Sequence, residues 1–215
     1  MFTLSESLFL LTLSENHGTI DTSAKGKFYY GLSGSILDEL ILLGKAQINP
    51  DRRLTIADAA MTGDRTLDSA LRRLEDIDHP RKATYWVKSV LNRPKKLQKQ
   101  IYNCLVSDGI LSQEEDEYRW VIPSQAFPNC NAAAKYCLKE SLRAIVLTNQ
   151  ETDLRNLALL SLLDASNHLR LVFTKDERRE AKQRIHELML SEALKNPAAE
   201  AIEEVQSAVA SLSAG

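Results

Sequence analysis

The amino-acid sequence predicts a mostly α-helical fold with two short β-hairpins, formed as a single compact domain over residues 1–215. Apolar residues recur at spacings of three and four along most of the chain, which is typical of amphipathic helices. Only two short stretches alternate between apolar and polar residues as strands do. The length suffices for one large domain or two small ones, and we expect one because no long linker interrupts the chain.

The N-terminal third is predicted to contain two helices and a hairpin. The apolar face of the first helix consists of Leu4, Leu8 and Leu11. Residues 35–44 are apolar on nearly every side, which predicts a helix at the centre of the fold that ends at Gly44. The glycines of "YGLSGS" (residues 30–35) indicate either close helix packing or the start of this helix. Residues 45–56 are predicted to form a hairpin.

Two amphipathic helices and a second hairpin follow in the middle of the chain. The apolar face of the first of these helices consists of Leu67, Ala70, Leu71 and Leu74. The apolar face of the second consists of Leu97, Ile101, Cys104 and Leu105. This second helix is predicted to end at Gly109. The hairpin, residues 112–122, has Tyr118 and Trp120 on one face of its return strand.

Three or four helices fill the C-terminal part, after a turn-rich loop at residues 123–131. The last helix has apolar residues spaced alternately by four and three, as in a coiled-coil seam: Ala198, Ile202, Val205, Val209 and Leu212. Such a seam serves either the core of a domain or a dimer contact. We favour the core, because most amphipathic helix faces pack inside their own domain.

Composition and charge argue against several classes of protein. A formal net charge of -2 argues against general adhesion to nucleic acid, so any anion site must be local. No apolar run approaches the ~20 residues that span a bilayer. The apolar start contains Glu6 and Glu15 and lacks a basic leader, unlike a signal peptide. The three cysteines have no metal-ligand spacing, and we interpret them as reduced thiols of a cytoplasmic protein.

The sequence contains no recognisable catalytic site, and we expect neither an enzyme nor a bound cofactor or metal. The four histidines form no metal-binding motif, and no nucleophile elbow, P-loop or dinucleotide-binding glycine pattern occurs. Asp64 and Asp68 have a spacing that could serve a metal or acid–base chemistry. Because they lie at the start of the helix of Leu67, we instead interpret Thr62 or Asp64 as its N-cap. Asp68 would add favourable negative charge to the first turn.

Residues 81–100 carry the strongest local electrostatic signal. They contain no Asp or Glu and seven positive side chains: Arg81, Lys82, Lys88, Arg93, Lys95, Lys96 and Lys99. In a slightly acidic chain this asymmetry indicates either an anion-binding surface or the solvated side of a surface helix. On the helix of Leu97, whose apolar face should turn inward, we expect Lys95, Lys99 and Tyr102 on the opposite side.

The start of that helix is a candidate anion site. Asn92 or Arg93 can cap it, and Pro94 is tolerated in its first turn, where backbone N–H groups lack intrahelical partners. These donors and the positive end of the helix dipole favour an anion, and Lys95 and Lys96 would stand beside it.

Six stretches of the sequence together resemble successive blocks of one protein family. They are "LSESLFLLTLSENHG", "GLSGSILDELILLGKAQI", "TGDRTLDSAL", "YWVKSVLN", "LQKQIYNCLVSDGIL" and "RNLALLSLLDASNHLRLVF". In this order they resemble the Golgi phosphoprotein 3 family, collinearly from about residue 3 to about residue 212. The combination is much more specific than any single motif. Eukaryotic members have a long arm before the first block, so we expect a short, prokaryotic-type member.

The resemblance implies a mostly helical domain that is peripheral to membranes and has no catalytic activity. Eukaryotic members bind phosphatidylinositol 4-phosphate and act as adaptors that retain glycosyltransferases in the Golgi. Their head-group site combines a tryptophan with basic residues around a surface pocket. We therefore expect a peripheral membrane or adaptor protein at the cytoplasmic face of a membrane. Its expected partners are an anionic phospholipid head group and client membrane proteins.

The family's head-group residues carry over in part. Two basic positions at the helix start fall on Lys95 and Gln98, and the arginine of the family's "GLRG" motif is Ser33 here. The aromatic position aligns near residue 24, and Lys25 and Lys27 are candidate substitutes. The predicted head-group residues are Lys95, Gln98, Lys96, Arg93, Ser33 and Lys27. Since lysine gives a point charge without the two-pronged grip of arginine, we expect lower selectivity among anionic head groups.

In the family a hydrophobic hairpin reaches the bilayer, and the second hairpin of this chain differs from it. Tyr118 and Trp120 could enter a membrane interface. Four acidic residues at positions 114–117 would be repelled by an anionic leaflet, at a cost of about 1 kcal/mol each. The hairpin could instead serve protein–protein contact, as in family oligomers. A homo-oligomer through residues 112–122 is therefore among the expected partners.

Two other functions stay open. A lysine-lined helix followed by a hairpin is also the outline of a winged-helix nucleic-acid-binding protein. The net acidity and the acidic hairpin argue against it, so no nucleic acid is expected as a partner. The other alternative is a protein-interaction scaffold that uses the hairpin of Tyr118 and Trp120 and binds no lipid.

Overall fold

The computed structural model describes residues 2–13, 25–90, 94–113, 120–121, 131–148 and 150–214. Within these ranges the chain is mostly helical and contains two small antiparallel sheets, as predicted. The N-terminal helices are α1 (Leu4–Thr12), α2 (Lys25–Leu42), α3 (Arg65–Glu75), α4 (Ala83–Val90) and α5 (Pro94–Ser107). The C-terminal helices are α6 (Asn131–Leu147), α7 (Leu154–Ala165), the 3-10 helix η2 (Leu169–Leu171), α8 (Arg178–Ala193) and α9 (Pro197–Ala214).

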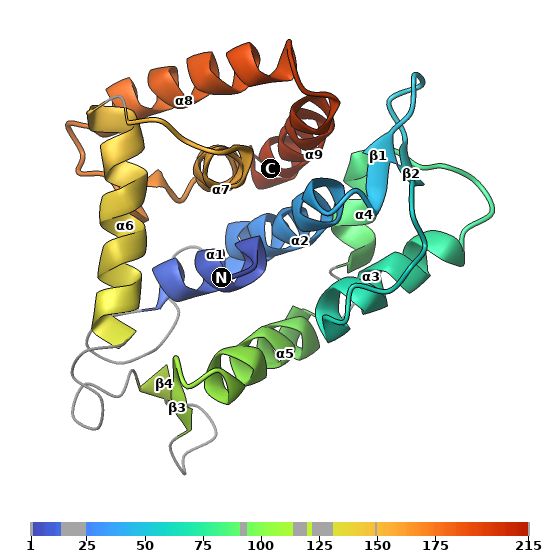
Figure 1. Ribbon diagram of the computed structural model, residues 1–215, viewed down its shortest axis with the longest axis horizontal. Helices are drawn as coiled ribbons and strands as arrows, with labels where there is room; N and C mark the ends of the chain where they lie inside the picture. The colour runs from blue at the N-terminus through green and yellow to red at the C-terminus, as the bar shows by residue number, and fades with distance from the viewer. Residues whose placement is uncertain are drawn as a thin grey trace.

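Helix α2 lies at the centre of the molecule, with other helices around it (Figure 1). It contacts α1, α3, α4, α7 and α9. Its residues from Gly31 to Ile41 are all buried, which confirms the central helix predicted from the all-round apolar stretch. Helix α1 is also buried along its whole length and begins with a capping box. In this box the hydroxyl of Thr3 accepts a hydrogen bond from the Glu6 amide, and the Glu6 carboxylate accepts one from the Thr3 amide.

The two glycines of "YGLSGS" lie where α2 and its neighbours approach closely. A Cβ atom added at Gly31 would lie 2.9 Å from Cβ of Ser166, which follows α7. One added at Gly34 would lie 2.7 Å from Cγ2 of Val209 on α9. Both distances are well inside the optimal separation of two carbon atoms, about 3.5–4.0 Å. Close helix packing, one of the two predicted roles, is therefore the role of these glycines.

Both predicted hairpins are present. The strands are β1 (Ala46–Ile48), β2 (Leu54–Ile56), β3 (Ser112–Gln113) and β4 (Trp120–Val121). β1 pairs antiparallel with β2, and Arg52 adopts a left-handed φ of 56° in the turn between them. β3 pairs antiparallel with β4. Tyr118 lies outside the described residues, and so does the side chain of Trp120.

The polar cluster before α3 is a capping arrangement. Asp64 is the N-cap residue, and its Oδ1 accepts hydrogen bonds from the amides of Thr66 and Leu67 at 2.7 and 2.8 Å. Asp68 accepts hydrogen bonds from both the amide and the hydroxyl of Thr62. Of the two caps considered from the sequence, Asp64 is the one that forms, and Asp68 ties the preceding loop to the helix.

Helix α5 begins at Pro94 and is followed by Gly109 with a left-handed φ of 70°, as predicted. One expectation for this helix is wrong. Tyr102 does not face solvent with Lys95 and Lys99, because it is only 8% exposed. α5 packs against both α1 and α3, so its buried face is wider than its apolar stripe indicates. Helix α4 was not predicted from the sequence, because its eight residues are too few to show a clear helical period.

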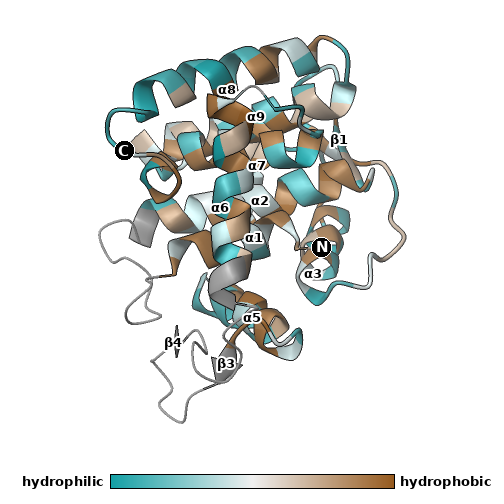
Figure 2. Ribbon diagram, turned by 60° about the vertical axis from the view of Figure 1, so that its left-hand side comes forward, coloured by the Kyte–Doolittle hydropathy of each residue, from teal (hydrophilic) through white to brown (hydrophobic). Residues whose placement is uncertain are grey.

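The predicted seam of α9 packs inside the core. Ile202, Val205 and Val209 have no exposed surface, and α9 contacts α2, α4, α7 and α8. The core interpretation of the seam is therefore confirmed. Helix α8 lies at the edge of the molecule and is largely hydrophilic (Figure 2). No helix in the described ranges combines the length and the apolar character needed to cross a bilayer.

A buried ion pair fixes α2 to two other helices. The Glu39 side chain on α2 is 4% exposed, and the guanidinium of Arg155 on α7 donates to both of its carboxylate oxygens, at 2.6 and 2.8 Å. The amide of Leu4, at the start of α1, donates to the same carboxylate at 2.8 Å. The three donors together satisfy a charge that would otherwise be costly to bury.

A second bidentate pair joins α6 to the start of α8. Arg143 donates to both carboxylate oxygens of Glu177, at 2.7 and 2.8 Å, and to the carbonyl of Val172. Glu177 also accepts a hydrogen bond from the amide of Thr174. These bonds, with the Arg143 guanidinium contributing most, lower the pKa of Glu177 from 4.5 to about 2.

Arg155→Met is expected to lower the free energy of unfolding by about 3 kcal/mol, because it leaves the Glu39 carboxylate buried without its cation. Glu39→Gln is expected to cost less, since Arg155 keeps 22% of its side chain exposed and can reach water. Urea denaturation of both variants measures the difference. A larger loss for Glu39→Gln than for Arg155→Met would contradict this account.

Glu177→Gln is expected to lower the Tm at neutral pH. The folded-state pKa of Glu177 is depressed, so its carboxylate stabilises the protein above pH 4.5, and this contribution is lost as the pH falls from 4.5 toward about 2. The Tm difference between wild type and variant should therefore shrink over that range. Thermal unfolding against pH measures it, with Glu151→Gln, at an exposed position, as the control. A difference that does not change with pH would refute the assignment.

Candidate functional site

The predicted lysines at the start of α5 are accessible. Lys95 and Lys96 lie in its first turn and are exposed, and Lys99 is exposed one turn later. None of the three forms an ion pair with another described residue. Arg93, also predicted for this site, lies outside the described residues, as does Asn92.

The other predicted head-group residues take three different positions. Gln98 is half-buried and faces α2, because its side-chain oxygen accepts a hydrogen bond from the Tyr29 hydroxyl at 3.0 Å. Burial raises the pKa of Tyr29, which keeps its hydroxyl protonated as a donor. Lys27 is exposed near the start of the same helix α2. Ser33 is completely buried, so its hydroxyl does not open onto a surface in this conformation.

A cavity of about 290 Å³ opens between α3 and α5, on the side of α5 that carries Lys96. The described residues that line it are Ile36, Thr66, Ser69, Ala70, Arg73, Val90, Lys96, Leu97 and Gln100. The cavity thus brings together Lys96, which was predicted, with Arg73 and Gln100, which were not. Lys95 and Gln98 do not line it.

Arg73 is the best-fixed cation of this cavity. Its Nη1 donates a hydrogen bond to the carbonyl oxygen of Ser89, near the end of α4, and the side chain is partly buried. Among the described residues no carboxylate pairs with Arg73 or with Lys96. The cavity wall therefore holds two positive charges that the described part of the protein does not neutralise.

The sequence indicates the side of α3 on which Arg73 lies, but not what that side faces. Thr66, Ser69, Ala70 and Arg73 occur at i, i+3, i+4 and i+7, which places them along one side of a helix. The sequence does not say which helix faces that side. Only the packing of α3 beside α5 turns this stripe into the wall of a cavity.

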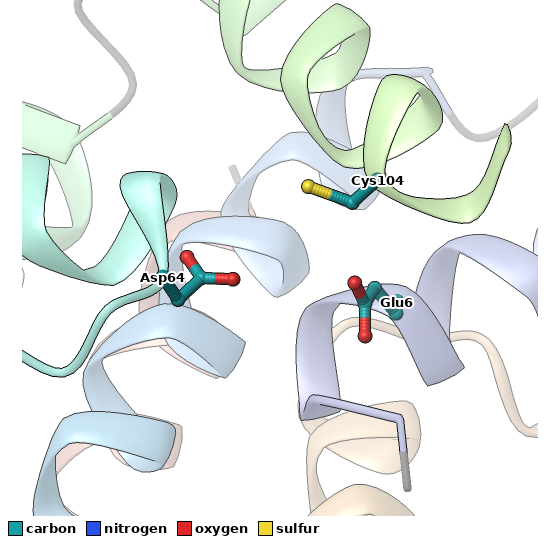
Figure 3. A group of neighbouring side chains, drawn as sticks. All are labelled: Glu6, Asp64 and Cys104. Atoms are coloured by element: carbon teal, nitrogen blue, oxygen red, sulfur yellow. The ribbon is translucent and has the colours of Figure 1, made fainter. Parts of the chain in front are cut away.

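Three potential metal ligands converge between α1, α3 and α5 (Figure 3). The ligand atoms of Glu6, Asp64 and Cys104 all lie within 4.8 Å of one another. Burial, and then the charges of Asp64 and Glu6, raise the pKa of the Cys104 thiol. Both carboxylates already serve helix starts, Glu6 in the capping box of α1 and Asp64 as the N-cap of α3. Capping accounts for their positions without an ion.

Comparison with known protein families agrees with the resemblance carried by the sequence motifs. The family model of Golgi phosphoprotein 3 (GPP34) matches residues 4–209, which is almost the whole chain. The matched region runs from the first residue of α1 into α9 and includes the cavity and the basic start of α5. The chain therefore belongs to the Golgi phosphoprotein 3 family.

Proposed function

We propose that this protein is a non-enzymatic peripheral membrane adaptor that binds an anionic phospholipid head group at the basic start of α5. The observation that carries the proposal is the state of the cations around this helix start. The described ones, Lys95, Lys96 and Lys99, are exposed and form no ion pair with another described residue. Family membership supports the same function.

The magnitudes favour a surface that acts through several residues at once. A lysine or arginine close to an anionic leaflet contributes about 1 kcal/mol of attraction. One such residue cannot hold a protein on a membrane, but three or four near one helix start can. The net charge of -2 limits this attraction to the basic region, so the proposal includes an oriented mode of binding.

The proposed surface is less selective than a pocket built from arginines. Lys95, Lys96 and Lys99 are point charges without a planar fork. Gln98 stands at a family position that is basic in eukaryotic members, and its side-chain oxygen is engaged by Tyr29. The protein should therefore distinguish anionic from zwitterionic surfaces better than it distinguishes one anionic lipid from another.

The adaptor part of the proposal concerns client membrane proteins and the cytoplasmic face of the membrane. The hairpin of β3 and β4 follows α5 directly in the chain and pairs Gln113 with Trp120. With the lysines at the start of α5 on the membrane, we place client contact or self-association on this hairpin, which follows the other end of the helix.

Charge reversal at the helix start is the direct test of lipid binding. Lys95→Glu combined with Lys96→Glu is expected to weaken binding to vesicles of phosphatidylcholine and phosphatidylserine by about 30-fold or more, since two attractions of about 1 kcal/mol are lost. The Tm should not fall, because both residues are exposed and glutamate is favourable in the first turn of a helix. Vesicle co-sedimentation measures the affinity. Co-sedimentation of the double variant equal to that of wild type would contradict the proposal.

A matched control separates local attraction from net charge. Lys175→Glu combined with Lys195→Glu changes the net charge equally, at exposed positions flanking α8, which lies at the opposite edge of the molecule from α5 (Figure 1). This control should retain most of the binding. Equal losses in both double variants would mean that the basic start of α5 is not the docking surface.

A further inference from the structure

The cavity between α3 and α5 has the chemistry of a site for one small anion. Its described lining supplies two cations, the two hydroxyls of Thr66 and Ser69, and the amide of Gln100, and it contains no carboxylate. Asp68, which lies five residues before Arg73 on the same helix, is held by the amide and hydroxyl of Thr62. Nothing in this lining would repel a doubly charged oxyanion.

The guanidinium of Arg73 is held in place before any ligand arrives. One N–H group of its Nη1 is used on the Ser89 carbonyl, and the remaining donors of the fork are not used by described residues. A fixed guanidinium loses little side-chain entropy when it binds a phosphate oxygen, and such charge-assisted bonds are about twice as strong as neutral ones. Arg73 therefore supplies the planar, two-pronged contact that lysines cannot.

The size of the cavity limits the ligand. The volume of about 290 Å³ is close to the lower limit of small-molecule sites, about 300 Å³. A phosphate group with a small polar substituent fits this volume, but an acyl chain does not. The floor is apolar, formed by Ile36 and Leu97, so water is partly excluded and the electrostatic attraction is less screened than on an open surface.

We propose that this cavity binds the terminal phosphate of a phosphate monoester. Arg73 and Lys96 contact the phosphate oxygens, and the Ser69 hydroxyl and the Gln100 amide donate to them from the two facing helices. The inference rests on the proposed function, because Lys96 belongs to both surfaces, and it adds a discrete site on the opposite side of α5 from Gln98. The monoester can be a lipid head group or a soluble phosphorylated molecule.

The experiment has a soluble arm and a membrane arm. In the soluble arm, glycerol 3-phosphate is titrated into the full chain and amide shifts are followed by NMR. A single-phosphate contact predicts saturable binding with a Kd of about 1 mM or tighter. In the membrane arm, vesicles of phosphatidylcholine with phosphatidic acid, a monoester lipid, are compared with vesicles that carry phosphatidylglycerol at the same surface charge. Tighter binding to phosphatidic acid identifies a lipid source, and saturation in the soluble arm alone identifies a soluble one.

Two matched pairs of variants locate the site. Arg73→Gln and Lys96→Gln each remove a charge from the cavity wall, and Arg72→Gln and Lys175→Gln remove the same charge from exposed positions outside both proposed binding surfaces. The cavity variants are expected to raise the Kd for the monoester about tenfold, and their controls less than about twofold. Equal effects within each pair, or no saturable binding in either arm, would overturn the inference.

A further variant distinguishes loss of the binding site from loss of stability. Arg73→Gln also removes the hydrogen bond to Ser89, so its Tm is compared with wild type. Ser69→Glu leaves that bond in place and sets a carboxylate four residues before Arg73 on the exposed side of α3, where it should compete with the phosphate. Monoester binding by Ser69→Glu that matches wild type would also refute the site.

The two proposals fail in different ways. In the first case, the double variant Lys95→Glu with Lys96→Glu no longer binds phosphatidylserine vesicles, but Arg73→Gln binds the monoester as wild type does. The cavity inference then fails and the membrane function stands. If glycerol 3-phosphate binding depends on Arg73 but vesicle binding is insensitive to the lysines, the membrane function fails and the cavity binds a soluble ligand.

Discussion

A helix buried on every side must satisfy its polar side chains within the protein, and this constraint governs α2 and everything packed on it. Glu39 meets the constraint with the Arg155 guanidinium and the Leu4 amide, which fixes where α7 and the start of α1 lie. Asp38, one residue earlier, is buried without a hydrogen bond from a described residue. Burial raises the pKa of Asp38 well above its ordinary value, and the nearby Gln206 side chain lowers it in part, so burial disfavours the charged carboxylate here.

The arrangement around α2 also produces the cavity. Helix α3 packs on α2, whereas α5 packs mainly on α1, and α3 and α5 touch each other over a smaller area. A seam between two helices that are positioned by different partners does not have to close. Here it leaves a space with Ile36 of α2 and Leu97 at its floor and with polar residues of α3 and α5 in its walls. The same buried helix that stabilises the fold therefore sets the geometry of the proposed phosphate site.

Membership of the Golgi phosphoprotein 3 family and the local chemistry of this chain give complementary information. The family match supports the proposed adaptor function, while the residues determine what kind of anion contact the chain can make. At the start of α5 the proposed contact is a set of exposed lysines, and in the cavity beyond it lies one arginine whose side chain is hydrogen-bonded to a backbone carbonyl. A lysine surface gives attraction without selectivity, and a fixed guanidinium gives directed hydrogen bonds, so the two parts have separable roles.

The sequence alone was enough to predict the helices with clear periods, both hairpins, the ends at Gly44 and Gly109, and the lysines of the first turn of α5, because these depend on residues close in the chain. It could not determine that Tyr102 is buried, that Gln98 meets Tyr29, or that Arg73 faces Lys96. Each of these depends on which helix lies opposite. Helical spacing fixes the side of a helix on which a residue lies, but the partner of that side is decided only when the helices pack around α2.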